Sequence, residues 1–176
     1  NPSIIAQSWY YFRVNQKIDP TNRVHAGLFN YHPQVIPAGR HINDEMGTFI
    51  ARRTVQELVQ VGVGSVGTKV LVFGLTFKED ISDTRNSPAI QIIKLLGKKG
   101  AKVAYSDYNV PQTKISGRSM TSVELNAETI SEFDAVITLV AHRKFDLAMI
   151  VDNAKILVDT KNVVGNLGHR SNVVRV

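Results

Sequence analysis

The stretch GLTFKEDISDTRNSP at residues 74–88 constrains the fold of this chain more than any other. It follows KVLVFG (69–74), a short apolar run of β-forming residues that predicts a buried strand. It ends in Ser87 and Pro88, a helix N-cap residue followed by a proline at the first helical position. Open α/β sheets bind ligands in loops of this kind, which follow the carboxyl end of a strand. The sequence therefore predicts either an anion-binding loop or a solvated crossover whose charges bind nothing.

Strand and helix patterns alternate along the rest of the chain, which is typical of a parallel sheet with helices on its faces. We expect helices at 41–61, 88–99, 123–130 and 146–152, and strands at 69–74, 102–106, 134–140, 155–159 and, at an edge, 173–176. The least regular pattern lies between residues 109 and 130. The predicted fold is α/β, with a doubly wound, mostly parallel, Rossmann-like sheet preceded by a long helix.

The helix predicted at 41–61 carries one apolar stripe. Its members lie near helical spacing and are Ile42, Met46, Phe49, Ile50, Leu58 and Val61. Arg53 and Thr54 interrupt the stripe. The stripe either packs on the core of the same chain or contacts a second subunit.

The run VGVGSVG at 61–67 has the spacing G-x-G-x-x-G. That spacing binds a pyrophosphate when it follows a strand and opens a helix, because the helix N-terminus then faces the phosphates. Here it follows a helical pattern and precedes a strand pattern. We therefore predict a connector, and an NAD-binding domain is an alternative that this run alone supports.

Composition indicates one globular domain with anionic partners. The chain has 176 residues, 43% of them hydrophobic, and a formal net charge of +6. Its cations are scattered, with pairs such as Arg52–Arg53 as the longest groups, so we expect nucleotides and no nucleic acid as partners. The sequence has no cysteine, no signal-peptide pattern and no apolar run of about 18 residues. We expect a cytoplasmic protein without disulfides or membrane contact.

Several stretches resemble the C-terminal domain of the UDP-glucose/GDP-mannose dehydrogenase family. The family signature G-h-x-F-K-x-x-x-x-D-x-R-x-S-P is matched at Gly74, Phe77, Lys78, Asp83, Arg85, Ser87 and Pro88. YHPQVIPAGRHINDEMG (31–47) resembles the start of the family's central helix. YSDYNVP (105–111) is similar to its YDP-type strand end, and LVAHRKF (139–145) and LVDTKNV (157–163) are similar to its last two strands. AGRHIND and AHRKF resemble the bacterial branch that acts on UDP-N-acetylhexosamines for surface polysaccharides.

The resemblance implies the UDP-sugar-binding domain of an NAD-dependent UDP-N-acetylhexosamine 6-dehydrogenase. Such enzymes oxidise the C6 hydroxyl of the sugar to a carboxylate, in two hydride transfers to NAD+ and through a cysteine-linked intermediate. The resemblance assigns contacts with the UDP-sugar to Phe77, Lys78 and Lys161, and weaker contacts to Arg40 and Asn43 at the helix start. Many family members carry arginine where Lys161 stands, so the capacity for bidentate hydrogen bonds is lower here.

Arg85 matches the family's arginine that reaches the pyrophosphate of NAD. Within this chain we expect it to face solvent or to pair with Asp83. Asp107, at the end of the strand predicted at 102–106, is interpreted first as a turn former and second as a ligand. His142 is interpreted as a loop residue. No catalytic residue is assigned, and no metal site is expected, because metal-ligand spacing is missing among His32, His41, His142 and His169.

The family's catalytic cysteine has no counterpart in this sequence. Residues 1–30 match nothing in the family and are unassigned. We expect 31–66 to form the central helix and connector, with a homodimer through the helix at 41–61, and 67–176 to form the UDP-sugar-binding domain. The chain alone is expected to be inactive, because the covalent intermediate needs a thiolate. The alternatives are a non-catalytic module that binds nucleotide diphosphates and the corresponding part of a UDP-glucose 6-dehydrogenase.

Overall fold

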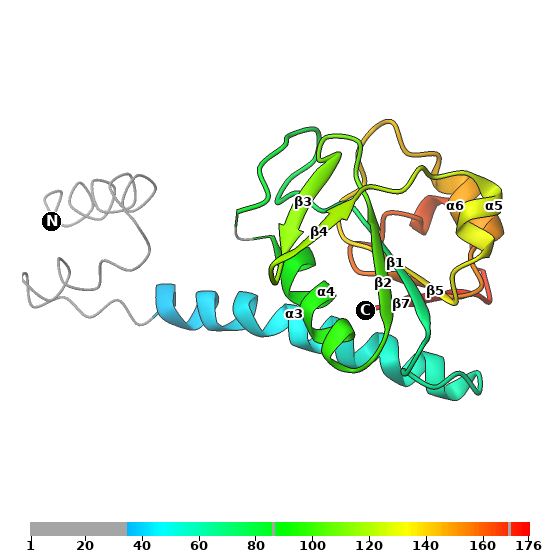
Figure 1. Ribbon diagram of the computed structural model, residues 1–176, viewed down its shortest axis with the longest axis horizontal. Helices are drawn as coiled ribbons and strands as arrows, with labels where there is room; N and C mark the ends of the chain where they lie inside the picture. Colours follow the sequence, from blue (N-terminus) through cyan, green and yellow to red (C-terminus); the bar gives the residue numbers. More distant parts are fainter. Residues whose placement is uncertain (1–34, 86, 169) are drawn as a thin grey trace, which may run out of the picture. The chain divides into compact units, whose positions relative to one another are not determined.

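The computed structural model describes residues 35–85, 87–168 and 170–176 (Figure 1). Asn43–Val176 form one compact unit, and Asn1–Ile42 belong to another. The lead-in predicted at 1–30 lies outside the described residues.

A five-stranded parallel sheet forms the centre of the larger unit (Figure 1). Its strands are β1 Lys69–Phe73, β2 Lys102–Ser106, β5 Ala135–Thr138, β6 Leu157–Asp159 and β7 Val173–Arg175. Their order across the sheet is β2-β1-β5-β6-β7, and each neighbouring pair is parallel. The predicted α/β fold with a parallel sheet is confirmed, and β7 is the predicted edge strand.

The strand order reverses at β1. From β1 the chain reaches β2 through α4 (Pro88–Lys98), and it later returns past β1 to β5. Helix α4 contributes Ile92 and Leu96 to the core on one face of the sheet. Helix α6 (Leu147–Asn153), which follows β5, contributes Ile150 to the core on the other face. The sheet is therefore doubly wound, and its topological switch point lies between β1 and β5, where sheets of this type bind ligands.

Helix α3 spans Val35–Gln60 and so begins before the predicted residue 41. Its side chains are described from Glu45 onward. The buried positions among them follow helical spacing and are Gly47, Ile50, Ala51, Thr54 and Leu58. This face packs on the core cluster that also contains residues of β1 and α4.

The expectation that Thr54 interrupts the apolar stripe of α3 is wrong. Thr54 does not interrupt the buried face but lies within it, because its hydroxyl donates to the Ile50 carbonyl oxygen at 2.9 Å and is thereby satisfied. The described members of the predicted stripe divide into two groups: Ile50 and Leu58 pack on the core of the same chain, whereas Met46, Phe49 and Val61 are exposed. Met46 and Phe49 precede the buried Gly47 and Ile50 by one position each, which turns them away from the core. Ile42 lies among the residues of α3 whose side chains are not described.

The VGVGSVG run forms turns and coil between α3 and β1, as predicted. It neither follows a strand nor opens a helix. It therefore lacks the backbone context that presents N–H groups to a pyrophosphate.

Helix α4 begins as the sequence predicts. Ser87 is its N-cap, with Oγ accepting a hydrogen bond from the Ala89 N–H at 3.2 Å, and Pro88 occupies the first helical position. The helix ends at Lys98, and Gly100 then adopts a left-handed φ of 89°.

A two-stranded antiparallel hairpin between β2 and β5 was not predicted. It consists of β3 (Gln112–Ile115) and β4 (Arg118–Thr121). The turn residues Ser116 and Gly117 have φ values of 52° and 79°, and such left-handed pairs form the two-residue turns that suit hairpins. The Ser-Gly pair between two four-residue runs was the signal for this hairpin in the sequence.

Some boundaries also differ from the predicted ones. Helix α5 spans Ala127–Ser131 rather than beginning at residue 123, because Asn126 caps it by accepting the Thr129 N–H at 2.8 Å. Strand β6 begins at Leu157 rather than at 155, and a short 3-10 helix, η1, follows it at Gly165–Leu167.

Gly74 ends β1 where the backbone meets the segment that follows β5. Its φ is +82°, and a Cβ at this position would collide with the carbonyl oxygen of Val140. Both the backbone conformation and the close approach require glycine here.

Replacing Gly74 with alanine should therefore destabilise the domain by about 3 kcal/mol or more, since neither backbone segment can move away without breaking the sheet. Gly97→Ala is the matched control, because nothing lies within 4 Å of a Cβ at that position in α4. Alanine there should stabilise the domain by about 0.5–1 kcal/mol. Urea unfolding measures both changes, and wild-type stability of Gly74→Ala would contradict this account of the β1 end.

Candidate functional site

The carboxyl ends of β1, β2, β5 and β6 lie at one edge of the sheet, because these strands are parallel. The loops that follow them form the candidate site. The loop after β1 is closed by a hydrogen bond from the Phe77 N–H to the Asp83 carbonyl oxygen at 2.8 Å. Phe77 and Lys78, two of the predicted substrate contacts, lie on this loop.

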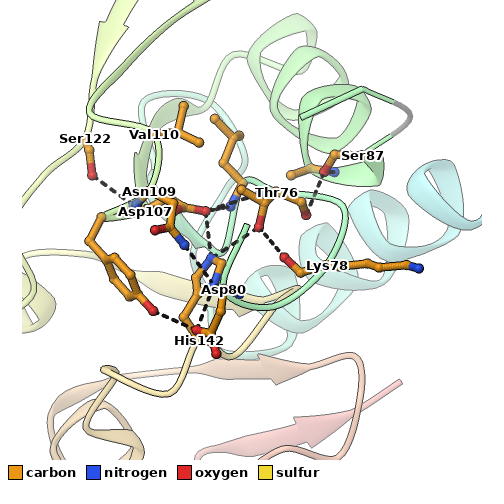
Figure 2. Close-up of polar contacts among 12 residues, drawn as sticks. Thr76, Lys78, Asp80, Ser87, Asp107, Asn109, Val110, Ser122 and His142 are labelled. Carbon is orange, nitrogen blue, oxygen red and sulfur yellow. Dashed lines mark hydrogen bonds and ion pairs between the residues drawn. The ribbon is translucent and has the colours of Figure 1, made fainter. Parts of the chain in front are cut away.

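His142 and Asp107 form a buried pair beside this loop (Figure 2). Nε2 of His142 lies 2.9 Å from Oδ2 of Asp107, and neither side chain is exposed to solvent. Asp107 follows β2 and His142 follows β5, the strands on the two sides of β1. The same Oδ2 accepts the backbone N–H groups of Leu75 at 2.7 Å and Thr76 at 3.2 Å. The pair therefore connects the ends of three adjacent strands.

The hydrogen bonds define which nitrogen of His142 carries the proton. The Asp80 N–H donates to Nδ1 at 2.9 Å, so Nδ1 is the acceptor and Nε2 carries the proton. That proton points to Asp107, and Nε2 also lies 3.2 Å from the Thr76 hydroxyl. The Thr76 hydroxyl donates its own hydrogen to the Lys78 carbonyl oxygen at 2.8 Å, which leaves it an acceptor toward the ring.

This cluster of histidine, aspartate and threonine is not a catalytic triad. In a triad the carboxylate and the hydroxyl contact different nitrogens of the ring. Here Asp107 and Thr76 both face Nε2, Nδ1 holds a backbone N–H, and the ring is closed to solvent. The cluster orders the loops around it.

Asp80 adopts a left-handed φ of 56° at the point where the β1 loop touches His142. Its carboxylate accepts a hydrogen bond from the Tyr108 hydroxyl at 2.9 Å and pairs with Arg143 Nε at 3.0 Å. The Tyr108 hydrogen bond, followed by the interactions with Arg143, lowers the pKa of Asp80 below its ordinary value, although partial burial opposes this. Asp80 therefore ties the β1 loop to the loops after β2 and β5.

Phe77 and Lys78 project from the same loop as exposed side chains. The Lys78 Nζ lies 5.8 Å from the centroid of the Phe77 ring. Figure 2 shows the Lys78 side chain directed away from the His142–Asp107 pair while its carbonyl oxygen is held by Thr76. The backbone at Lys78 is thus hydrogen-bonded on the inner side of the loop, and the Lys78 ammonium group points away from it.

Lys161 lies on the loop after β6, at the same edge of the sheet. Asp159 holds this loop, because its buried carboxylate accepts the Lys161 N–H at 3.2 Å, the Thr138 hydroxyl at 3.1 Å and the N–H groups of Val163 and Val164 at 3.1 Å each. The Lys161 side chain itself is exposed. A second buried carboxylate thus positions a second exposed lysine.

Arg85 faces solvent and pairs with Asp83, as expected. Its guanidinium binds the carboxylate through Nε at 3.0 Å and Nη2 at 2.8 Å, while 86% of the Arg85 side chain is exposed. The hydrogen bond from this side chain lowers the pKa of Asp83 from 3.8 to about 2. The arginine is well placed to exchange its partner for another anion.

The other predicted residues fall into two groups. Arg40 and Asn43 lie within α3, but their side chains lie outside the described residues. Asp107 acts as the predicted turn former, since its buried side chain accepts the Asn109 N–H through Oδ1 at 2.9 Å. The pairing of Asp107 with His142 was missed. The sequence signal for this pairing was that Asp107 and His142 each follow closely on a predicted strand. Those two strands, β2 and β5, lie on the two sides of β1.

A pocket of about 460 Å³ opens beside the end of β2. Tyr108, Ser122, Lys144 and Phe145 are among the residues that line it, and Lys144 Nζ lies 5.1 Å from the Tyr108 ring centroid. Phe77, Lys78 and Lys161 do not line this pocket. The prediction that these three residues share one cleft stays a prediction.

The motif that the sequence offers for a dinucleotide lies outside the strand-turn-helix context such a site needs. The one G-x-G-x-x-G run lies between a helix and a strand, and Arg85 is the residue that the family resemblance connects to NAD. Within the described ranges, no group of three or more His, Asp or Glu side chains is arranged to hold a metal ion. No described helix combines the length and apolar character needed to cross a bilayer.

Comparisons with known proteins agree with one another. Residues 71–166 match the UDP binding domain of the UDP-glucose/GDP-mannose dehydrogenase family. A UDP-N-acetyl-D-glucosamine 6-dehydrogenase of Salmonella typhi is 33% identical over 129 residues, which cover 73% of this chain and 30% of that protein. Protein CapL of Staphylococcus aureus is 33% identical over 156 residues, which cover 85% of this chain and 36% of CapL.

The solved structures give the same result. The UDP-N-acetyl-mannosamine dehydrogenase Cap5O of Staphylococcus aureus matches with a TM-score of 0.60 and 26% identity, over 90% of this chain and 34% of that one. The chain therefore spans about a third of the length of the relatives it matches.

Replacing Arg85 with alanine should raise the pKa of Asp83 from about 2 toward 3.8, because the carboxylate loses its main hydrogen-bond donor. The depressed pKa means that the pair stabilises the fold above pH 3.8 and that this contribution is lost as the pH falls toward about 2. An NMR titration of the side-chain carboxyl carbon measures the shift. In the control variant Arg143→Ala, the pKa of Asp80 should rise and that of Asp83 should not move. An unchanged pKa of Asp83 in Arg85→Ala would show that the pair does not form in solution.

Proposed function

The chain belongs to the UDP-glucose/GDP-mannose dehydrogenase family, and we propose that it is the UDP-sugar-binding part of an NAD-dependent UDP-N-acetylhexosamine 6-dehydrogenase. The family match includes the ends of β1, β2, β5 and β6, where the candidate site lies. UDP-N-acetylhexosamines are the proposed substrate class, because two of the three relatives described above are named for UDP-N-acetyl sugars. UDP-glucose is the alternative substrate.

One observation carries this proposal. Lys78 and Lys161 follow two parallel strands at the same edge of the sheet, and within the described part of the chain neither forms an ion pair. The diphosphate of UDP carries about two negative charges at neutral pH, and lysine ammonium groups can meet them with charge-assisted hydrogen bonds. Phe77, whose side chain is exposed beside Lys78, offers an apolar ring to the nucleotide sugar.

The remaining roles are part of the same proposal. Arg85 would leave Asp83 to contact the pyrophosphate of NAD in the longer enzyme, which supplies the NAD-binding fold. Arg40 and Asn43 would add contacts at the start of the central helix. The boundaries 31–66 for the helix and connector and 67–176 for the binding domain, and a cytoplasmic location, stay predictions from the sequence.

The 176-residue chain should bind UDP weakly, and NAD+ less well. Lys78→Ala and Lys161→Ala should each lower the affinity for UDP about tenfold, since each removes one charge-assisted contact worth ~1.4 kcal/mol. Isothermal titration calorimetry measures this, and Lys94→Ala, which removes an exposed lysine of α4, is the matched control. Equal affinities of the three variants would contradict the proposed site.

The same chain, given UDP-N-acetylglucosamine and NAD+, should form no NADH above background. It contains no cysteine, and loss of a covalent nucleophile typically removes many orders of magnitude of rate. NADH absorbance follows the reaction. Turnover that survives repurification and disappears in Lys78→Ala would show that this chain is an enzyme by itself.

We also propose a homodimer through α3. Met46 and Phe49 are 41% and 53% exposed on this helix, and apolar side chains exposed close together mark association surfaces. Light scattering should show a dimer whose mass falls toward the monomer in Phe49→Glu. A monomeric wild type at high protein concentration would exclude this interface.

A further inference from the structure

We infer that His142 is a positioning residue for the UDP-sugar loop, the segment from Gly74 to Arg85 that carries Phe77 and Lys78. This inference rests on the proposed function, which assigns those two residues to the substrate. His142 itself is closed to solvent. It acts through the backbone N–H of Asp80, which donates to Nδ1 at 2.9 Å.

The attachment points of the loop lie on both sides of the proposed substrate contacts. Asp107 accepts the N–H groups of Leu75 and Thr76 before them, and His142 accepts the N–H of Asp80 after them. All three bonds converge on one buried pair, because His142 donates to the same Asp107 oxygen that Leu75 and Thr76 contact. Phe77 and Lys78 are therefore the residues whose backbone this pair holds in place.

No apolar packing replaces this attachment. Every residue from Phe77 to Ser82 is exposed, so the middle of the loop has little contact with the core. Asp80 also holds a left-handed φ of 56°, a conformation that is uncommon for residues with a side chain and most frequent among them for Asn and Asp. The hydrogen bond to His142 is the buried contact that fixes this turn.

The ring is well placed for this role because its surroundings hold it rigidly. Asp107 fixes Nε2, and the Tyr108 and Phe145 rings pack against the imidazole with centroids 5.0 Å and 5.4 Å away. The charged groups that face the ring are the carboxylates of Asp107 at 2.9 Å and Asp80 at 3.9 Å, and Arg143 pairs with the latter. The ring is thus a fixed acceptor to which the loop is attached through the Asp80 N–H.

Two amide variants separate the two functions of the ring. In His142→Asn the side-chain oxygen can replace Nδ1 as the acceptor for Asp80 but does not reach Asp107. In His142→Gln the side-chain nitrogen can replace Nε2 as the donor to Asp107 but leaves the Asp80 N–H without its acceptor. The loop-holding role is preserved in the first variant and lost in the second.

The test measures UDP affinity by calorimetry and hydrogen exchange of the Asp80 amide by NMR in the full chain. In His142→Gln we expect UDP to bind about tenfold more weakly and the Asp80 amide to exchange about tenfold faster, since one hydrogen bond of about 1.4 kcal/mol is lost. In His142→Asn both quantities should stay within about threefold of wild type. A residue that only fills the core would not rank the variants in this order, because each variant removes one of its two hydrogen bonds.

The outcomes distinguish this inference from the proposed function. If wild type does not bind UDP, the proposed function fails, and unchanged exchange of the Asp80 amide in His142→Gln overturns the loop attachment independently. If wild type binds UDP through Lys78 and folded His142→Gln binds it equally well, the positioning role is wrong while the proposed function stands. If His142→Gln does not fold, the UDP affinity and the Asp80 amide exchange of His142→Asn decide whether the positioning role holds. A folded His142→Asn that protects the Asp80 amide yet loses more than about tenfold in UDP affinity overturns the inference.

Discussion

The hydrogen bond between His142 and Asp107 is the interaction on which the rest of the site depends. Both side chains are excluded from water, where a carboxylate is costly unless it is fully hydrogen-bonded. Asp107 meets this requirement with one imidazole and the backbone N–H groups of Leu75, Thr76 and Asn109. Those bonds fix the start of the loop after β1. Removing the ring would leave a buried acceptor with fewer donors, at a cost of about 1–3 kcal/mol, and would leave the Asp80 N–H without its acceptor.

The buried carboxylates at this edge accept their hydrogen bonds from groups other than lysine. The nearby lysines therefore stay available for an anionic ligand. Asp159 uses backbone N–H groups and the Thr138 hydroxyl, as Asp107 uses backbone and imidazole. The exposed carboxylates of Asp80 and Asp83 pair with arginines instead. Lys78 and Lys161 are therefore presented on loops whose backbones are fixed while their ammonium groups face solvent. A fixed backbone reduces the entropy lost when a flexible side chain orders around an anion.

At this edge of the sheet, the hydrogen bonds of His142 are made within the protein. His142, the described histidine at the site, carries its proton toward a buried aspartate and offers its other nitrogen to a backbone N–H. The chain spans about a third of its relatives, and it matches the part of the family that is described as the UDP binding domain. The match to a UDP binding domain supports the proposal that this edge of the sheet binds the nucleotide sugar.

The sequence by itself determined the features that local patterns control. The apolar run at β1, the Ser87–Pro88 helix start and the family signature on the loop between them predicted the fold class, the position of the loop and its exposed cations. Local patterns did not reveal the pairing of His142 with Asp107 or the burial of Thr54, because both depend on how the elements pack. Asp80 and His142 are 62 residues apart and Asp107 and His142 are 35 apart, so their contact exists only once β2 and β5 lie on the two sides of β1. Strand order is a property of the whole sheet, and the tertiary structure alone decided which polar residues became buried partners and which stayed exposed to meet a ligand.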